Sequence, residues 1–442
     1  MRVLHYSLGF PPYRTGGLTK YCCDLMESQV SRGFDVALVW PGSMRGSFGF
    51  KKHSNWRGIA NWEMTAPLPV PYDEGIVDPL LFMESRDFSV CEGFLKAFAP
   101  DVLHVHTTMG LPLEFVQSAH DLGIRTIFTT HDYYPLCPRV TLFHDGEPCV
   151  VDSFCRQCPA CNAHGLSLNK IRLLQSPAYR AIKNTAFVKT MRARHRNSVG
   201  SGSQPVHDFE PKAKAESYYV LRDRNLRLLG LFDIIHANST LAAGKYGKHL
   251  PGSNIRVVAI GSLETRELRL GKAYRTNTPV RIGYFGAASS AKGYYLLMEA
   301  LCLLWNEGMR FELHLYGPFE CDAPFASVRP RYSYNEIDSV YQDTDLAVVP
   351  SLWPETFGFQ ATEALCRGVP VAVSSMVGMK DILGEEMGVV FEPTVQACAE
   401  ALRRCLDPAV LSAMRSAIAA DFIPPRLESV ESLYGEGRSH EV

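Results

Sequence analysis

The chain has 442 residues, of which 46% are hydrophobic and 21% are charged, and its formal net charge is -1. This ordinary globular composition indicates two or three domains and excludes a disordered chain. The near-zero charge excludes a protein that binds nucleic acid or another polyanion through its overall charge. No stretch reaches the roughly 18 apolar residues that a membrane span needs, and MRVLHYSLGFPPYRTGG does not resemble a secretory signal. We therefore expect a cytoplasmic protein.

The first half of the sequence predicts a βαβ unit followed by further parallel strands. RVLHYSL (2–8) is typical of a buried strand, LTKYCCDLMESQVSRG (18–33) of an amphipathic helix, and FDVALVWPG (34–42) of the next strand. Short β-branched runs predict more strands at 101–108, 125–132, 232–239 and 255–261. This pattern favours a parallel, doubly wound α/β sheet.

A second run of strands begins at VRIGYFG (280–286) and predicts another domain of the same kind. Its remaining strands are expected at 311–317, 346–351, 369–375 and 387–393. The polar stretch 262–279 lacks apolar periodicity and is the best linker candidate. We expect an N-terminal domain (1–275) with an insertion at about 137–230, a C-terminal domain (276–420), and a last segment (421–442) that packs back toward the N-terminal domain.

The segment PSLWPETFGFQATEALCRGVPVAVSS (350–375) places Glu355 and Glu363 eight positions apart. It follows an expected strand of the second domain, and parallel sheets bind ligands at the carboxyl ends of their strands. We expect a helix over Thr356–Arg367, stopped by Gly368. At a rise of about 1.5 Å per residue the two carboxylates would lie roughly 12 Å apart, too far to hold the same atom.

Groups that suit phosphate lie beside these acids. Free N–H groups at the expected helix start include those of Phe357 and Gly358. Gly16 and Gly17 separate the first strand from the first helix, where a bare backbone can approach a phosphate, or they form a simple tight turn. Lys292 offers a positive charge, or is an ordinary surface lysine. A nucleotide diphosphate sugar has the matching order of hydroxyls, phosphates and hydroxyls.

Four segments together resemble retaining glycosyltransferases of the GT-B fold, in particular glycosyltransferase family four. PETFGFQATEALCRGVPVAVS resembles the family's motif of two glutamates separated by seven residues. GGLTKYCCDL resembles its glycine-rich first loop, TTHDYYPLCPR its histidine loop, and GYFGAASSAKG the segment that opens its donor domain. The order and spacing of all four agree with the family. The resemblance implies two Rossmann-like domains that face each other across a cleft.

The resemblance also implies roles for individual residues. Glu363 would bind the ribose hydroxyls, Glu355 would face the donor sugar near its reacting carbon, and the amides of the first helical turn would hold phosphate and sugar. His131, which ends a strand, would lie beside the reacting sugar, with a structural histidine as the alternative. The family's arginine shortly before Lys292 is missing, so another arginine reaches the site or the leaving group is stabilised less. For His104 and His106, we expect one to face the core or the cleft.

The activity implied by the resemblance is transfer of a sugar, with retention of configuration, from a nucleotide diphosphate donor to a glycan or lipid-linked acceptor. No cofactor is expected for the chemistry, because Lys292 and helix dipoles can serve the diphosphate. The expected setting is cell-surface polysaccharide or glycolipid assembly. A non-catalytic nucleotide-sugar-binding protein and a GT-B epimerase or phosphorylase are the alternatives.

The expected insertion contains a cysteine cluster and a basic stretch. Cys137, Cys149, Cys158 and Cys161 have spacing that suits a structural zinc, with Cys155 as the least certain member, and free thiols are an equal alternative. Residues 169–228 hold thirteen Lys or Arg against four Asp or Glu, mixed with apolar side chains. Such a segment is typical of contact with the anionic surface on the inner face of a membrane, or of a solvated helical face.

Overall fold

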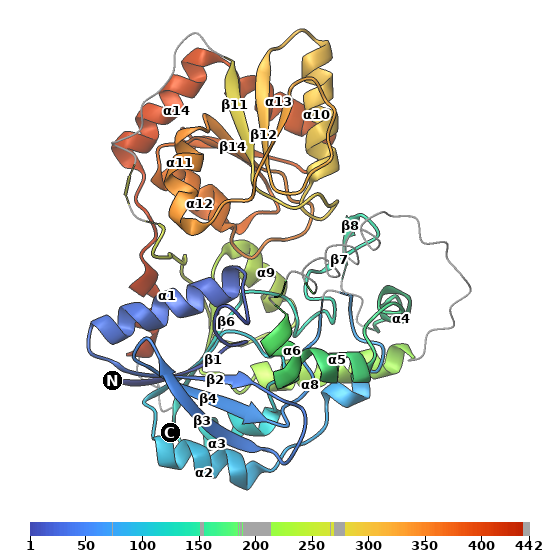
Figure 1. Ribbon diagram of the computed structural model, residues 1–442, viewed down its shortest axis with the longest axis vertical. Helices are drawn as coiled ribbons and strands as arrows, with labels where there is room; N and C mark the ends of the chain where they lie inside the picture. Colours follow the sequence, from blue (N-terminus) through green and yellow to red (C-terminus); the bar gives the residue numbers. More distant parts are fainter. Residues whose placement is uncertain are drawn as a thin grey trace.

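The computed structural model of the protein describes residues 1–72, 74–150, 154–183, 185, 188, 214–265, 267–268 and 279–435. Two α/β units lie one beside the other along the long axis of the molecule (Figure 1). The first is built on an eight-stranded sheet and the second on a six-stranded sheet. The fold class expected from the sequence, two Rossmann-like units, is therefore confirmed.

The first sheet has the strand order β10-β9-β6-β5-β1-β2-β4-β3. Its strands are β1 (Arg2–Tyr6), β2 (Asp35–Pro41), β3 (Gly49–Trp56), β4 (Ile59–Thr65), β5 (Val102–Val105), β6 (Arg125–Thr129), β9 (Ile234–Ala237) and β10 (Ile255–Val257). All neighbours are parallel except β3 and β4. The helices of this unit are α1 (Gly17–Ser31), η1 (Pro79–Phe82), α2 (Phe88–Phe98), α3 (Leu113–Asp121), α8 (Ala215–Leu229) and α9 (Thr240–Gly247).

The second sheet is parallel throughout, with the order β13-β12-β11-β14-β15-β16. Its strands are β11 (Val280–Tyr284), β12 (Phe311–Tyr316), β13 (Ala326–Arg329), β14 (Leu346–Val349), β15 (Val371–Ser374) and β16 (Gly388–Phe391). The helices are α10 (Tyr294–Asn306), η3 (Tyr334–Glu336), α11 (Ile337–Gln342), α12 (Phe359–Cys366), η4 (Gly378–Ile382), α13 (Val395–Cys405), α14 (Pro408–Asp421) and η5 (Leu427–Tyr434).

Each strand expected from the sequence is present, and three further strands extend the sheets. Strands β3, β4 and β13 were not expected. The sequence of β3, GFKKHSNW, is polar, and half of its residues are exposed because it is the antiparallel edge strand of the first sheet. A strand that covers little of the core needs no apolar alternation, which is why the pattern missed it.

The last segment of the chain returns to the first unit. Helix η5 lies against α1 and β6. The Ser28 hydroxyl donates to Glu428 at 2.8 Å, and Arg32 donates to both carboxylate oxygens of Glu431 at 2.6 and 2.5 Å. One hydrophobic cluster contains Tyr21 of α1 together with core residues of the second unit. The two units therefore pack against each other, and the end of the chain passes from the second unit back onto the first.

The insertion between β6 and β9 is built from short elements. These are β7 (Phe143–His144), β8 (Glu147–Pro148), α4 (Cys158–Cys161), α5 (Leu168–Leu174) and α6 (Pro177–Ile182). Residues 189–213 of the basic stretch, and most of the expected linker, lie outside the described residues. Across the part of the chain that the structure describes, no helix has both the length and the apolar character needed to cross a membrane.

Candidate active site

A cleft of about 970 Å³ lies between the two units, beyond the carboxyl ends of β6, β11 and β14. Parallel sheets bind ligands at this end of their strands. Of the residues predicted for catalysis and donor binding, all but Gly16 line the cleft: Gly17, His131, Lys292, Glu355, Phe357, Gly358 and Glu363. Gly16 lies directly before α1 as its N-cap residue, with a φ of 120° that favours glycine.

Glu355 lines the cleft, is buried, and is held by three donors. Its Oε1 atom accepts hydrogen bonds from Lys292 Nζ at 2.5 Å, Ser351 Oγ at 2.5 Å and Trp353 Nε1 at 3.2 Å. Burial raises the pKa of Glu355, but the charge of Lys292 and these hydrogen bonds outweigh it, so the pKa lies below its usual value. None of the described residues donates to Oε2. Glu355 is thus a fixed carboxylate with one oxygen left for a ligand.

The helix that follows Glu355 begins later than the sequence predicts. We expected Thr356–Arg367, whereas α12 spans Phe359–Cys366 and Gly358, with a φ of 109°, is its N-cap. The backbone of Glu355 instead forms a parallel bridge with Val377, because loop atoms rather than helix atoms satisfy its hydrogen bonds. The estimate of roughly 12 Å along a helix axis therefore does not apply, since only one of the two glutamates is helical.

The starts of α1 and α12 meet at the cleft. The Phe359 ring comes within 3.8 Å of the point where Gly17 would carry a Cβ atom. Within the described residues, the N–H groups of Phe357 and Gly358 have no acceptor. Both helices direct free N–H groups and the positive end of their dipoles to one place. This arrangement suits a bound phosphate.

Glu363, on α12, is as buried as Glu355 but has a different environment. Among the described residues, the one side chain that donates to it is Tyr341, whose hydroxyl lies 3.5 Å from Oε2. Burial raises the pKa of Glu363 to about 7, although Arg367 and Lys20 act in the opposite direction. A carboxyl group that is near its titration point in neutral solution can accept hydrogen bonds from hydroxyl groups and can also donate one.

His131 lies two residues beyond β6 at the first-unit wall of the cleft. Its ring is 4.9 Å from that of Tyr21, and its carbonyl accepts a hydrogen bond from Thr356 Oγ1 at 3.1 Å. Burial lowers the pKa of His131 to about 3, with a smaller contribution from His236, so the ring is neutral. We expected one of His104 and His106 to face the core or the cleft, whereas both are fully buried. His104 lies in β5 and His106 directly follows that strand, and residues two apart in extended backbone lie on the same face.

Two family models match the chain in order. Residues 16–158 match the glycosyl transferase 4-like domain, and residues 279–408 match the glycosyl transferases group 1. Together the matches span more than half of the 442 residues. The chain belongs to the group 1 glycosyltransferases. No curated protein matches it.

Solved structures of similar fold include several glycosyltransferases. Sucrose-phosphate synthase from Thermosynechococcus elongatus is 14% identical with a TM-score of 0.52, and the match covers 98% of this chain and 96% of that one. HepE from Anabaena, in complex with UDP-glucose, is 13% identical with a TM-score of 0.53 over 99% and 98% of the chains. WaaG, a glycosyltransferase involved in lipopolysaccharide biosynthesis, is 13% identical with a TM-score of 0.53 over 98% and 100%. These likenesses show the shared GT-B fold.

Cations and aromatic rings that sequence reasoning missed also line the cleft of this glycosyltransferase. Lys20 Nζ contacts Asp24 at 2.8 Å and lies 4.5 Å from the centre of the Tyr334 ring. Arg331 lines the cleft from the loop after β13, beside Tyr332. Lys20, four residues after Gly16 in the glycine-rich loop, could have been found from its position on the first helical turn. Arg331 carries no such signal, because β13 was not expected.

The cysteines of the insertion are not part of the cleft. Among the described residues, the one group of three side chains with ligand atoms within 4.8 Å of one another is His5, Cys22 and His106. No three cysteine sulfurs of the insertion lie that close to one another. Burial and neighbouring thiols raise the pKa of the Cys137 thiol to about 12. The zinc site therefore stays a prediction.

Proposed function

We propose that this glycosyltransferase transfers a sugar from a nucleotide diphosphate sugar to a glycan or lipid-linked acceptor, with retention of anomeric configuration. The observation that carries the proposal is the fixed Glu355 carboxylate, which lies in contact with Lys292 in a cleft where two helix starts meet. Supporting it, HepE, which has the same fold, was solved with UDP-glucose. The cleft volume also suits a ligand of this size.

The nucleoside would occupy the second-unit wall. Phe285 stacks on Tyr316 with ring centres 5.1 Å apart, and Tyr332 lies edge-on to Phe285 at 6.0 Å. These rings line the cleft and can pack against a base. Glu363, whose charge acts on Tyr332, would then meet the ribose hydroxyls. A buried carboxyl group with few donors of its own is suited to that contact.

The diphosphate would lie between the helix starts of α1 and α12, near Lys292. Arg331 and Lys20 line the same cleft and supply positive charge in place of the arginine that the family normally has before Lys292. The sugar would then lie between Glu355 and His131. With this placement the negatively charged phosphates of the nucleotide sugar lie beside positively charged side chains or free N–H groups.

In the proposed reaction, the acceptor hydroxyl attacks the anomeric carbon from the face that the diphosphate leaves. The bond from carbon to phosphate oxygen breaks, a bond from carbon to acceptor oxygen forms, and the acceptor proton passes to the departing phosphate oxygen. The free Oε2 of Glu355 stabilises the positive charge that develops at the anomeric carbon. Lys292 and the helix starts stabilise the negative charge of the leaving group.

A panel of nucleotide sugars tests this function. We expect slow release of free nucleotide from one donor, because the site that activates the donor for transfer also activates it toward water. Release should be lost in the Glu355→Ala variant. A protein that binds a nucleotide sugar without releasing nucleotide would instead be a non-catalytic binder, and conversion of the donor to another sugar would indicate an epimerase.

We also propose that the basic insertion contacts an anionic membrane surface that carries the acceptor. In its described part, Leu173 of α5 is 61% exposed and Ile182 of α6 is 51% exposed. Lys170 and Arg172 lie on the same short helix as Leu173. Exposed apolar side chains beside cations are typical of interfacial segments. In addition, WaaG, which has the same fold, is involved in lipopolysaccharide biosynthesis.

Liposome sedimentation tests this contact. Arg192, Arg194 and Arg196, which lie outside the described residues, are replaced with glutamine. Three contacts at about 1 kcal/mol each predict a weakening of roughly a hundredfold as an upper bound. Replacing Arg310, Arg403 and Arg404 on the second unit is the matched control and should change little. Equal binding to neutral and anionic liposomes would contradict the proposal.

We further propose a structural zinc bound by Cys137, Cys149, Cys158 and Cys161. Metal analysis should find one zinc per chain, and replacing Cys158 and Cys161 with serine should remove it and lower thermal stability. Cys302→Ser, at an exposed cysteine outside the insertion, is the control. Metal-free protein of full stability would contradict the proposal.

A further inference from the structure

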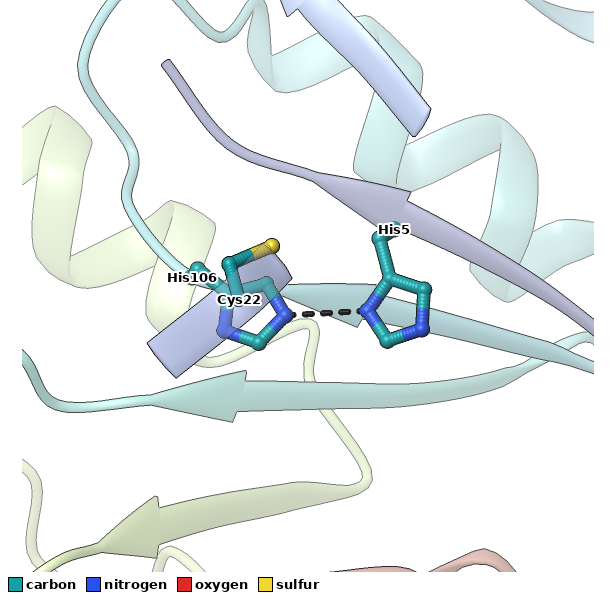
Figure 2. A group of neighbouring side chains, drawn as sticks. All are labelled: His5, Cys22 and His106. Atoms are coloured by element: carbon teal, nitrogen blue, oxygen red, sulfur yellow. Dashed lines mark hydrogen bonds between the residues drawn. The ribbon is translucent and has the colours of Figure 1, made fainter. Parts of the chain in front are cut away.

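Buried hydrogen bonds lead from His131 at the cleft into the first unit. His131 Nε2 lies 3.3 Å from His106 Nδ1. His106 Nε2 lies 2.9 Å from His5 Nδ1, the contact drawn in Figure 2. His5 Nε2 lies 2.8 Å from Gln29 Oε1. His5, His106 and Gln29 are completely buried, so these contacts are shielded from bulk solvent.

The same contacts continue through the returning end of the chain. The amide nitrogen of Gln29 lies 3.2 Å from the Tyr434 hydroxyl, which lies 2.8 Å from His104 Nδ1. His104 Nε2 lies 2.7 Å from Thr129 Oγ1, and this oxygen lies 2.9 Å from His236 Nδ1. His236 Nε2 ends the chain at 2.8 Å from the carbonyl oxygen of Val258. Eight contacts thus link the cleft to a backbone carbonyl.

The Val258 carbonyl fixes the donor-to-acceptor direction of all eight hydrogen bonds. A carbonyl oxygen only accepts, so His236 carries its proton on Nε2 and accepts on Nδ1. Thr129 must then donate to His236 and accept from His104 Nε2, which leaves His104 Nδ1 to accept from the Tyr434 hydroxyl. The Tyr434 oxygen can then only accept from Gln29, which turns the amide oxygen of Gln29 toward His5.

The remaining three rings follow in the same way. His5 donates from Nε2 to Gln29 and accepts on Nδ1, His106 donates from Nε2 to His5, and His131 donates from Nε2 to His106. Each ring must be neutral for this to hold. Burial lowers the pKa of all of them, to about 4 for His5 and His236, to about 3 for His131, and well below the usual value for His104 and His106.

We propose that this chain of hydrogen bonds holds His131 in the tautomer with its proton on Nε2, so that Nδ1 faces the cleft as an acceptor for a hydroxyl group of the donor sugar. No described residue donates to Nδ1, and His131 lines the cleft. Tyr434, Thr129 and Gln29 are positioning residues, since they act only through His131. The identity of the hydroxyl rests on the proposed function, whereas the tautomer does not.

A metal ion on His5, Cys22 and His106 is the competing interpretation of part of this chain. Figure 2 shows the three side chains together, and their ligand atoms lie within 4.8 Å of one another. A metal would need lone pairs on both His5 Nδ1 and His106 Nε2, which would break their hydrogen bond. Burial also raises the pKa of the Cys22 thiol, which disfavours the thiolate that a metal needs.

Nitrogen NMR of histidine-labelled protein without donor tests the tautomer, with His131→Ala for assignment. We expect a neutral His131 protonated at Nε2. Protonation at Nδ1, a charged ring near neutral pH, or a tightly bound metal that is lost in Cys22→Ser would overturn the proposal. Because no donor is present, this result is independent of whether the protein transfers sugars.

Variants then test the positioning residues. Tyr434→Phe and the nearly isosteric Thr129→Val each break the row of hydrogen bonds between His131 and the Val258 carbonyl. We therefore expect two tautomers of His131 in each variant. If the competent fraction halves, the apparent donor Kd rises about twofold. Tyr246→Phe is the control, since its buried hydroxyl donates to the Asp132 carbonyl, which is not part of the row of hydrogen bonds from His131. An unchanged single tautomer in Tyr434→Phe or, should that variant not fold, in Thr129→Val would overturn the role assigned to these residues.

Discussion

The two glutamates of the cleft, Glu355 on the loop after β14 and Glu363 on α12, are similarly buried but have opposite electrostatic surroundings. Glu355 is 7% exposed and Glu363 is 5% exposed, yet the pKa of the first is lowered and that of the second is raised to about 7. Lys292 contacts Glu355 at 2.5 Å, whereas Glu363 has a single distant hydroxyl donor among the described residues. Contact with a cation, more than burial, therefore decides which glutamate keeps its charge.

This difference matches the two proposed tasks. A permanent negative charge is needed where positive charge develops during bond breaking. Hydroxyl groups of a ribose carry no charge and need acceptors rather than an ion. The surroundings of Glu355 are thus suited to chemistry, and those of Glu363 are suited to binding.

The largest effect is expected at Glu355. Replacing Glu355 with alanine should lower kcat roughly a hundredfold to a thousandfold, as removal of a preorganised electrostatic group does, with little change in donor Kd. Steady-state kinetics and calorimetry of donor binding check the two quantities. Glu355→Gln, which keeps the shape and loses the charge, should behave like the alanine variant. A large loss of donor affinity with normal kcat would reverse the assignment.

Glu363 should affect binding instead. Replacing it with alanine removes hydrogen bonds from a carboxyl group to hydroxyls, and we expect the donor KM to rise roughly tenfold to a hundredfold with a smaller change in kcat. The same kinetic assay on Glu355→Ala shows whether the two glutamates affect kcat and donor KM differently. If the two variants show the same pattern, the division of roles is wrong.

The raised pKa of Glu363 also predicts a pH dependence of stability. Protonation of Glu363 favours the folded state, so its contribution is fully present below the unfolded pKa and is lost as the pH rises through about 7. The loss is on the order of 3 kcal/mol as an upper bound. Glu363→Gln should remove it and be more stable than wild type at pH 8. Urea unfolding at pH 5 and pH 8 measures this, and identical pH profiles would contradict the account.

Lys292 provides the converse test. Without this lysine Glu355 is buried and unpaired, so Lys292→Met should raise the pKa of Glu355. In wild type the lowered pKa means that the carboxylate stabilises the fold above its unfolded pKa, and this is lost only as the pH falls through the lower folded value. In the variant we expect a loss of about 1–3 kcal/mol near neutral pH, since Lys292 is partly exposed. Adding Glu355→Gln should restore much of it; no restoration would mean that the pair is not coupled.

Local motifs were enough to predict which residues of the second unit line the cleft around Glu355. Glu355, Phe357 and Gly358 lie in the loop between β14 and α12, and Glu363 lies on α12, so their spacing in the sequence largely fixes their spacing in the fold. Even there the helix start was misplaced, because the backbone of Glu355 is paired with Val377, which lies in a different segment. Hydrogen bonds between separate segments leave no periodic signal.

The opposite wall depends on contacts that the sequence does not show. His131 was identified from its loop, but the side chains that are hydrogen-bonded in sequence from its ring lie on six separate elements, among them η5 with Tyr434, more than three hundred positions away. On the second unit, Arg331 was missed because it follows β13, an edge strand that was not expected. The polar strand β3 was missed for the same reason, since edge strands need little apolar alternation.

We propose that Glu355 and Lys292 form the catalytic pair of a retaining glycosyltransferase. The most direct measurement is proton NMR of the sugar released when the enzyme slowly hydrolyses its donor, recorded before the anomers equilibrate. We expect the first sugar to appear to have the anomeric configuration of the donor, and we expect Glu355→Ala to release it roughly a hundredfold to a thousandfold more slowly. Release of the opposite anomer, or wild-type release by Glu355→Ala, would contradict it.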